Sequence, residues 1–510
     1  MSRRRSRRRV AVRSLFWSFR CRHQNTTQRC VVFLDIRRYG RAMMSRGTDQ
    51  AAVHDAVRAA RRGAAEWSAM TGAERRHHLL RWKQAMYRRR GEILQVLQDE
   101  TGKVGADAQI ELTMTLHHLD WAAHHAHRVL RPRRVAPGML MLDHRASVER
   151  RPFGVVGVIG PWNYPIYTPM GSVSYALAAG NVVVLKPSEH APRAGRWLAD
   201  TFRDASGLDA VLQAIPGGPE AGEALCEAGV DKLAFTGSAR TGARVMATCA
   251  AHLTPVVMEL GGKDAAIVAA DADLSSAADA IMWGATMNSG QSCAGIERVY
   301  VVDDVAEPFT AIMAERAGRL RAGVDYGQMT VPAQVEIVRR HIHAAIADGG
   351  VAVVGGPHSV RPPYIDPVVL LDVPEMSTAV TEETFGPTVT ITVVPDIETA
   401  ISRANAVDYG LGAAVFSRRR GREIARRLDV GMVSINDVVS FGAVPGLPFG
   451  GRGGSGFGRI HGAEGLREFT SPVSVSERRR VYLPTRVDSH RRRPWDLPVL
   501  RACLHIVGAR

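Results

Sequence analysis

The length, composition and charge of the chain indicate a folded protein with basic ends. With 510 residues, 45% of them hydrophobic and 23% charged, it is long enough for two or three domains. The net charge of +16 is carried by the ends: residues 1–46 hold fourteen Arg and one Asp, and residues 478–510 hold nine Arg and two Asp. Because the body between them is slightly acidic and offers no basic platform with stacking aromatics, we expect no specific nucleic-acid binding. No apolar stretch is long enough to span a bilayer.

The six cysteines are irregularly spaced, at positions 21, 30, 226, 249, 293 and 503, and none forms a Cys-x-x-Cys motif. This spacing fits neither a disulfide framework nor a zinc site. We therefore expect no metal and a location in the reducing cytoplasm.

Residues 1–46 precede every recognisable motif and are rich in Arg. Three interpretations stay open: a translation start that lies near Met43 or Met44, a disordered basic arm, and a targeting peptide. We expect a basic extension without fixed structure.

The body alternates between helical and strand-like patterns. Residues 50–102 show helical spacing of apolar residues. Short apolar runs at 155–159, 182–185, 233–235 and 256–260 then alternate with helical stretches, which predicts a parallel sheet in a doubly wound cofactor domain. A second α/β region is predicted from about 261 to 445, with a helix at 274–287 and strands at 299–302, 351–354 and 389–394.

The most informative motif is Gly-Gln-Ser-Cys at 290–293, which lies 34 residues after Glu259 in Met-Glu-Leu-Gly-Gly-Lys at 258–263. A lone cysteine is usually a packing residue. Small and polar neighbours, however, allow a ligand to approach the backbone, and a nearby carboxylate can act as the base that a thiol nucleophile needs. This pair suggests covalent thiol chemistry.

Six motifs in a fixed order make the chain resemble the NAD(P)-dependent aldehyde dehydrogenase superfamily. They are Pro-Trp-Asn-Tyr-Pro at 161–165, Lys-Pro-Ser-Glu at 186–189, Phe-Thr-Gly-Ser at 235–238, the motif at 258–263, the motif at 290–293, and Glu-Thr-Phe-Gly-Pro at 383–387. The segment 447–462 is similar to the C-terminal signature of that superfamily. The resemblance covers about residues 50–475 and is strongest to the class 3-like and succinate-semialdehyde dehydrogenase-like branches.

The resemblance implies an α/β fold with a Rossmann-type cofactor domain, an α/β catalytic domain and a small oligomerisation hairpin. The expected borders are 47–130 and 151–260 for the cofactor domain, 261–446 for the catalytic domain, 131–150 and 471–487 for the oligomerisation elements, 447–470 for the signature segment, and 488–510 for a basic tail. The implied assembly is a homo-oligomer, either a dimer or a tetramer.

The resemblance also assigns catalytic roles. Cys293 is the expected nucleophile that forms a thiohemiacetal and then a thioester. The Asn163 amide and the backbone N–H of Cys293 are the expected oxyanion donors. Glu259 is the expected base for water, with a pKa raised by a partly apolar pocket. Because branches that transfer the acyl group to CoA generally lack this glutamate, we expect hydrolysis to a free acid.

The cofactor site implied by the resemblance has no Gly-x-Gly-x-x-Gly motif. Gly237 and Ser238 would instead present backbone N–H groups and a helix N-terminus to the pyrophosphate. Lys186 and Glu189 would bind the adenosine ribose, Glu383 the nicotinamide ribose, and Phe385 would pack against the ring. The remaining expected cofactor residues are Pro161 and Trp162. Since Glu189 would repel a 2′-phosphate, NAD is the expected cofactor and NADP the alternative.

Two alternatives accompany this interpretation. The first is a succinate-semialdehyde dehydrogenase, which needs cations at the pocket mouth; Arg298 and Arg452 are candidates that the sequence cannot place. The second, from another class, is a catalytically silent or membrane-surface-associated protein, since the apolar residues 494–500 are flanked by Arg. The intact Cys293, Glu259 and Asn163 disfavour a silent protein.

Overall fold

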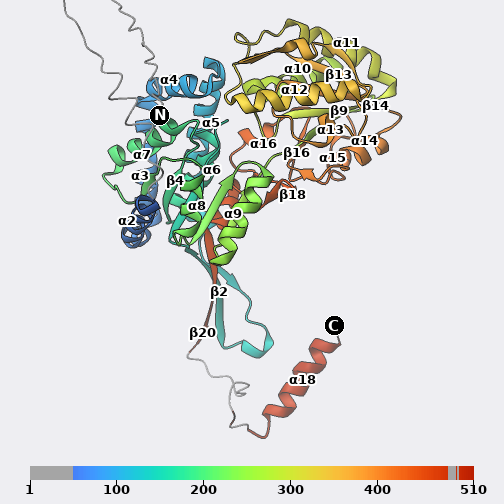
Figure 1. Cartoon of the computed structure of the whole chain (residues 1–510). Helices are drawn as coiled ribbons and strands as arrows, with labels where there is room; N and C mark the ends of the chain where they lie inside the picture. The colour runs from blue at the N-terminus through green and yellow to red at the C-terminus, as the bar shows by residue number, and fades with distance from the viewer. Residues whose placement is uncertain (1–49, 480–489, 491–492, 510) are drawn as a thin grey trace, which may run out of the picture. The chain divides into compact units, whose positions relative to one another are not determined.

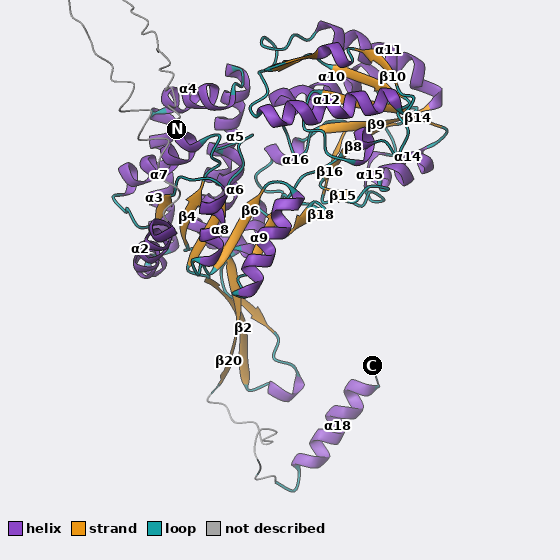
Figure 2. Cartoon of the chain, viewed as in Figure 1, coloured by secondary structure: helices purple, strands orange, loops and turns teal. Residues whose placement is uncertain are grey.

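The computed structural model describes residues 50–479, 490 and 493–509 (Figure 1). The predictions for residues 1–46 and for 480–487 lie outside these residues. Figure 2 shows that helices and strands alternate through most of the described chain. The predicted α/β class is therefore confirmed.

Four helices open the described chain, as the spacing of apolar residues predicts. They are α2 (Gln50–Ala69), α3 (Gly72–Arg88), α4 (Arg90–Thr101) and α5 (Gly105–Val129). Thr71 begins α3 with a capping box, because its hydroxyl accepts from the Glu74 N–H while the Glu74 carboxylate accepts from the Thr71 N–H. Trp67 and Trp82 are fully buried and anchor α2 and α3 to the core.

A six-stranded sheet has the order β19-β7-β6-β3-β4-β5. Its parallel strands are β3 (Val155–Ile159), β4 (Val182–Lys186), β5 (Leu212–Ala214), β6 (Lys232–Thr236) and β7 (Val256–Glu259), and the antiparallel edge strand is β19 (Gly456–Phe457). Four of these strands match the predicted apolar runs. Such runs suit strands that are covered on both faces.

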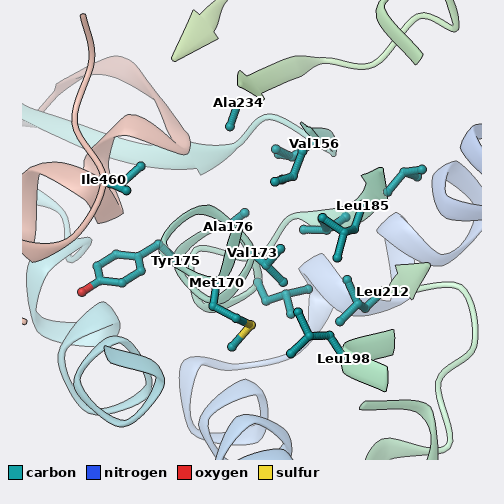
Figure 3. Close-up of a cluster of buried hydrophobic side chains, with 14 of the residues drawn as sticks. Val156, Met170, Val173, Tyr175, Ala176, Leu185, Leu198, Leu212, Ala234 and Ile460 are labelled. Atoms are coloured by element: carbon teal, nitrogen blue, oxygen red, sulfur yellow. The ribbon is translucent and has the colours of Figure 1, made fainter. Parts of the chain in front are cut away.

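Helices cover both faces of this sheet, as a doubly wound fold requires. Helices α6 (Tyr167–Ala178) and α7 (Pro192–Ser206) connect β3, β4 and β5, whereas α8 (Pro219–Glu227) and α9 (Ala239–Ala251) connect β5, β6 and β7. Figure 3 shows Met170, Val173 and Ala176 of α6 together with Val156 and Leu185 of the sheet. These side chains are fully buried and form the centre of the largest apolar core.

A second sheet of seven strands has the order β10-β13-β14-β9-β8-β16-β17. Its strands are β8 (Asp264–Val268), β9 (Ile296–Val302), β10 (Val351–Val354), β13 (Val368–Leu371), β14 (Thr388–Val394), β16 (Gly412–Phe416) and β17 (Met432–Ile435). All neighbours are parallel except β10 and β13. The predicted strands at 299–302, 351–354 and 389–394 all belong to this sheet.

The second sheet has its own apolar cores. One lies against α10 (Leu274–Thr286) and α11 (Asp303–Arg319), and another against α14 (Ile397–Ala404) and α15 (Gly421–Ala425). A third gathers α12 (Pro332–Ala347) and α13 (Thr378–Thr381) beside β13. Figure 1 shows these helices around the strands of the second sheet, in yellow and orange. Each sheet is thus enclosed by its own helices.

A third sheet has the order β1-β2-β20 and is entirely antiparallel. It consists of β1 (Arg133–Val135), β2 (His144–Pro152) and β20 (Thr470–Arg478). The short helix η1 (Met139–Met141) joins β1 to β2. The segments predicted as a hairpin therefore pair with one another, and their role in assembly stays a prediction.

The remaining elements are short, with one exception near the C-terminus. The short elements are η2 (Met287–Gly290), η3 (Pro357–Ser359), β11 (Val360–Arg361), β12 (Tyr364–Ile365), β15 (Tyr409–Gly410), α16 (Ser440–Ala443), β18 (Arg452–Gly453) and α17 (Gly462–Glu468). The exception is α18 (Asp496–Gly508), a helix of 13 residues inside the segment expected to be only a basic tail.

Candidate active site

The predicted motifs of the first sheet lie where its parallel strands end. Residues 160–163 follow β3, Lys186 ends β4, Gly237 follows β6 and Glu259 ends β7. Since parallel strands end at one edge, these residues lie at a common edge of the sheet. This edge is where doubly wound folds bind nucleotides.

The thiol-bearing segment enters the same region through a left-handed turn. Asn288, Ser289 and Gly290 have φ values of 50°, 62° and 71°. A Cβ atom at Gly290 would lie 2.2 Å from the backbone of Gly386, so a larger residue does not fit. The glycine of the Gly-Gln-Ser-Cys motif therefore permits contact with the motif at 383–387.

A cavity of about 140 Å³ lies between the edge of the first sheet, the segment that carries Cys293 and the motif at 383–387. Eight predicted site residues line it: Pro161, Trp162, Asn163, Gly237, Ser238, Cys293, Glu383 and Phe385. The cavity is not lined by the three other predicted residues, Lys186, Glu189 and Glu259. The sequence prediction omitted five lining residues: Thr168, Thr236, Leu260, Gly261 and Gln334. Of these, Thr236, Leu260 and Gly261 belong to the quoted motifs, whereas no sequence signal singled out Thr168 or Gln334.

Both the side chain and the backbone carbonyl of Asn163 form hydrogen bonds. Its side-chain Nδ2 donates to the Gln291 carbonyl at 3.0 Å, and its backbone carbonyl accepts from Lys103 Nζ at 3.0 Å and from Asn288 Nδ2 at 3.0 Å. An amide nitrogen carries two hydrogens, so one N–H remains for a substrate oxygen.

A buried ion pair supports this loop. Lys103 Nζ lies 2.5 Å from Glu111 Oε2, and both side chains are fully buried. The other carboxylate oxygen of Glu111 accepts from the backbone N–H of Ile166 at 2.9 Å and of Tyr167 at 3.1 Å. Nothing in the sequence pattern identified Glu111 as the partner of Lys103.

A second buried ion pair supports the loop at 383–387. Lys263 Nζ bonds Glu297 and donates to Thr384 Oγ1 at 3.0 Å. Glu297 in turn accepts from the backbone N–H groups of Thr384 and Phe385, both at 2.8 Å. This pair connects the strand after Glu259 to the loop that carries Glu383.

Glu259 is buried without any hydrogen-bond partner for either carboxylate oxygen. Burial raises the pKa of Glu259 to about 8, with smaller contributions from the charges of Glu383 and Asp264. This agrees with the expectation of an apolar pocket around the carboxylate. A carboxyl group with this pKa can take up and release a proton near neutral pH.

Cys293 is partly exposed and lines the cavity. Burial raises the pKa of Cys293 well above its usual range, and the charges of Glu259 and Glu383 raise it further. The thiol must therefore lose its proton to a base during the reaction.

Glu383 is bonded to the turn after Glu259. Its Oε1 accepts from the Gly262 N–H at 3.1 Å, and a Cβ atom at Gly261 would lie 2.5 Å from the same oxygen. Burial raises the pKa of Glu383 to about 8, and the charge of Glu297 contributes. Gly261 thus leaves the space that this carboxylate occupies.

Lys186 and Glu189 lie together at the end of β4. The Lys186 ammonium is nearly buried and is 3.1 Å from the Glu189 carboxylate, which is exposed. At the end of β6, Ser238 begins α9, and its hydroxyl accepts from the Thr241 N–H at 3.4 Å. An ammonium, a carboxylate and a helix N-terminus at one sheet edge suit a dinucleotide with its ribose hydroxyls and pyrophosphate.

Tyr167, His118 and His461 form an aromatic group that the sequence did not predict. Burial raises the pKa of Tyr167 well above its usual range, and the neighbouring Cys293 makes a smaller contribution. His118 and His461 are buried with their ring centres 3.9 Å apart, and each lies within 6 Å of the Tyr167 ring. Burial lowers the pKa of both imidazoles. This group is therefore uncharged at neutral pH.

The two arginines considered for a substrate carboxylate are bonded elsewhere. Arg298 is buried and donates to the Lys263 carbonyl at 2.8 and 2.9 Å. Arg452 forms an ion pair with Asp429. Neither guanidinium lines the cavity.

A doubly wound sheet with a thiol, an amide and a buried carboxylate at its ligand-binding edge defines an enzyme of nucleotide-dependent thiol chemistry. The comparisons specify which: residues 41–475 match the model of the aldehyde dehydrogenase family. The chain belongs to this family and is an NAD(P)-dependent oxidoreductase that acts on aldehydes.

Two curated relatives and one solved structure illustrate the similarity. The chain is 38% identical to 4,4′-diapolycopene aldehyde oxidase of a Methylomonas species, over 88% of this chain and 85% of the relative. It is 35% identical to the Mycobacterium tuberculosis protein named "Putative succinate-semialdehyde dehydrogenase NADP(+) 2", over 90% and 91%. The structure of lactaldehyde dehydrogenase from Escherichia coli matches with a TM-score of 0.81 at 29% identity, over 84% of this chain and 91% of that one.

Proposed function

We propose that this protein oxidises an aldehyde to a free carboxylic acid through a thioester on Cys293 that water hydrolyses. The observation that supports this most strongly is the buried Glu259 carboxylate, which has no partner in the structure and a pKa of about 8. A base of this kind can activate water for hydrolysis, a step that is absent when CoA removes the acyl group.

In this mechanism Glu259 first takes the proton of the Cys293 thiol, whose raised pKa keeps it protonated at rest. The thiolate sulfur then adds to the aldehyde carbon. The free N–H of the Asn163 amide and the backbone N–H of Cys293 stabilise the oxyanion, a contribution of about 3 kcal/mol per donor. Glu259 must release this first proton to solvent before the next step. As a carboxylate again, it then takes a proton from the water that attacks the thioester, and the Cys293 thiolate leaves.

The cofactor would lie between the predicted site residues at the edge of the six-stranded sheet and those of the loop at 383–387. Gly237 and Ser238 would bind its pyrophosphate, Lys186 and Glu189 its adenosine ribose, and Glu383 its nicotinamide ribose, with Pro161, Trp162 and Phe385 around them. When bound, the nicotinamide accepts the hydride that leaves the former aldehyde carbon. Because the exposed Glu189 carboxylate would repel a 2′-phosphate, we propose a preference for NAD.

The substrate that fits best is an uncharged aldehyde with an apolar or aromatic body. The aromatic group of Tyr167, His118 and His461 is uncharged at neutral pH, and Arg298 and Arg452 are bonded elsewhere. A relative named as an aldehyde oxidase of the polyene diapolycopene supports this class. Succinate semialdehyde is the second candidate, because other relatives carry that name.

We also propose that the protein is a homo-oligomer, and the three-stranded sheet β1-β2-β20 supports this assembly. Val135, Met139, Leu140 and Leu142 of this segment are exposed. Contiguous exposed apolar side chains commonly mark a protein interface. We propose the cytoplasm because the spacing of the cysteines fits no disulfide framework.

The proposal is tested with purified protein, NAD and a panel of aliphatic, aromatic and semialdehyde substrates, followed by NADH absorbance. We expect turnover without CoA, loss of turnover in Cys293→Ala, and normal turnover in the control Cys503→Ala. Turnover that requires CoA, or activity that persists in Cys293→Ala, would contradict the mechanism.

A further inference from the structure

The C-terminal helix α18 has a broad apolar face that no other part of the described chain covers. Leu504 is 73% exposed, Val507 66% and Leu497 53%, and Val499 and Ile506 are also exposed. Figure 1 shows α18 as the last element of the chain, in red. Apolar side chains at this exposure normally require a partner.

From Leu497 to Gly508, the apolar and polar residues of α18 lie on different faces. Asp496, the first residue, is on the apolar side, where it is buried and accepts from the Arg493 N–H. At 3.6 residues per turn, the apolar side chains of residues 497–507 spread over an arc of about 220°. Pro498, Arg501, His505 and Gly508 occupy the remaining arc. A helix of this pattern suits a boundary between an apolar and an aqueous phase.

The charged residues around α18 indicate which apolar partner suits this helix. Residues 478–510 hold nine Arg and two Asp, and Arg491, Arg492 and Arg493 stand directly before the helix. The ring of Trp495, beneath the Arg493 guanidinium at 5.7 Å, is 49% exposed. Arginines and a tryptophan beside an apolar helix are complementary to the anionic headgroups of a lipid surface. Two copies of this segment would instead repel each other through these charges.

The length of the helix decides between lying on a membrane and crossing it. Its 13 residues measure about 20 Å, whereas the hydrocarbon core is about 30 Å thick. Within the described residues, no helix is long and apolar enough to span a bilayer. An amphipathic helix of this length lies in the plane of the interface.

We propose that α18 binds the surface of an anionic membrane, with its apolar face in the headgroup region and Arg501 and His505 toward water. This attachment is independent of the catalytic assignment. It would bring the enzyme to the phase in which apolar aldehydes dissolve.

The test uses the full chain in co-sedimentation with two kinds of vesicle, phosphatidylcholine alone and phosphatidylcholine mixed with phosphatidylserine. We expect binding to the mixed vesicles and little to phosphatidylcholine alone. Leu504→Asp, on the apolar face, should weaken binding about tenfold or more, because a buried Leu side chain contributes about 1.5 to 3 kcal/mol. The matched control His505→Asp adds the same charge on the polar face and should bind nearly as well as the wild type.

Three results would overturn the proposal. The first is that the wild type does not sediment with the mixed vesicles. The second is that Leu504→Asp and the wild type bind these vesicles equally. The third is an equal loss in both variants, which would show attraction by charge without apolar insertion. Light scattering of the same samples adds a check: a lower oligomeric mass in Leu504→Asp alone, without vesicle binding by the wild type, would assign the face to a second copy. Aldehyde turnover in solution should be the same in all three proteins.

Discussion

A Cβ atom placed on Gly262 would lie 2.4 Å from the carbonyl oxygen of Cys293. The turn that follows Glu259 is therefore in backbone contact with the residue that carries the thiol. Gly262 and Cys293, which are 31 residues apart in sequence, meet at this point, and the contact exists only because residue 262 has no side chain.

Gly262→Ala should lower kcat by about a hundredfold, because separating these backbones displaces the thiol by a fraction of an ångström or more. Steady-state kinetics with the best aldehyde measures this effect. The control is Gly91→Ala on α4, where a Cβ atom would meet nothing within 4 Å and a helical alanine should stabilise slightly. Normal kcat in Gly262→Ala would contradict the contact.

Removing one partner of the buried ion pair between Lys103 and Glu111 should lower the free energy of unfolding by a large amount. Lys103→Met leaves a fully buried carboxylate unpaired, which costs about 3 to 5 kcal/mol. The double variant Lys103→Met, Glu111→Leu removes both charges and should lose less. Chemical denaturation of the wild type, both single variants and the double variant gives the coupling energy. A loss in the double variant that equals the sum of the two single losses would show that the two charges do not interact.

Much of the fold follows from local patterns that the sequence displays. The fully buried strands β3 and β4 are unbroken runs of apolar residues, and α2 to α4 show regular helical spacing. Such patterns depend on neighbouring residues only, so the sequence alone predicts them. The motifs at 258–263 and 290–293 are also local, so the sequence alone singles out Cys293 and Glu259, and their catalytic roles stay a prediction.

Contacts between distant residues could not be predicted in this way. Glu111 and Glu297 are ordinary charged residues in the sequence, and their burial depends on Lys103 and Lys263 arriving from other elements. His461 is packed against His118, which lies more than three hundred residues earlier. Helix α18 was missed because the arginines around it led to the assignment of residues 488–510 as a basic tail.

The choice of cofactor should depend on Glu189. Glu189→Gln removes the charge that repels a 2′-phosphate, so the ratio of kcat/KM for NADP to that for NAD should rise about fivefold, equivalent to about 1 kcal/mol. Kinetics with both cofactors measures this ratio. Glu336→Gln, on the exposed surface of α12, is the control and should leave it unchanged. A wild-type enzyme that prefers NADP would refute the proposed role of Glu189.

The raised pKa of Glu259 should also make the stability of the protein depend on pH. An unfolded glutamate has a pKa near 4.3, whereas the folded value is about 8. Between these values the folded state holds a proton that the unfolded state has lost, so the free energy of unfolding falls as pH rises through this window.

Glu259→Gln removes this dependence and should be more stable than the wild type by a few kcal/mol above pH 8, on the order set by the pKa difference. Below pH 4 the difference should be small, because the carboxyl group is then neutral in both states. Denaturation at several pH values measures it. Glu307→Gln, at an exposed position, is the control and should show no such trend; a pH-independent difference in Glu259→Gln would contradict the buried, unpartnered carboxylate.

The same variant separates hydrolysis from transfer to CoA. Glu259→Gln keeps the shape of the side chain but cannot accept a proton, so steady-state turnover should fall by about 10² to 10⁴. The first turnover should still release a burst of NADH where another base or a high pH deprotonates Cys293, and the acyl group should then remain on the sulfur. Mass spectrometry of the quenched variant should find that acyl group on Cys293. In the wild type, the rate of deacylation should rise with pH and level off above about pH 8, because the base is active only as the carboxylate. A variant that turns over normally, or a wild-type rate that falls as pH rises through 8, would show that Glu259 is not the base for water.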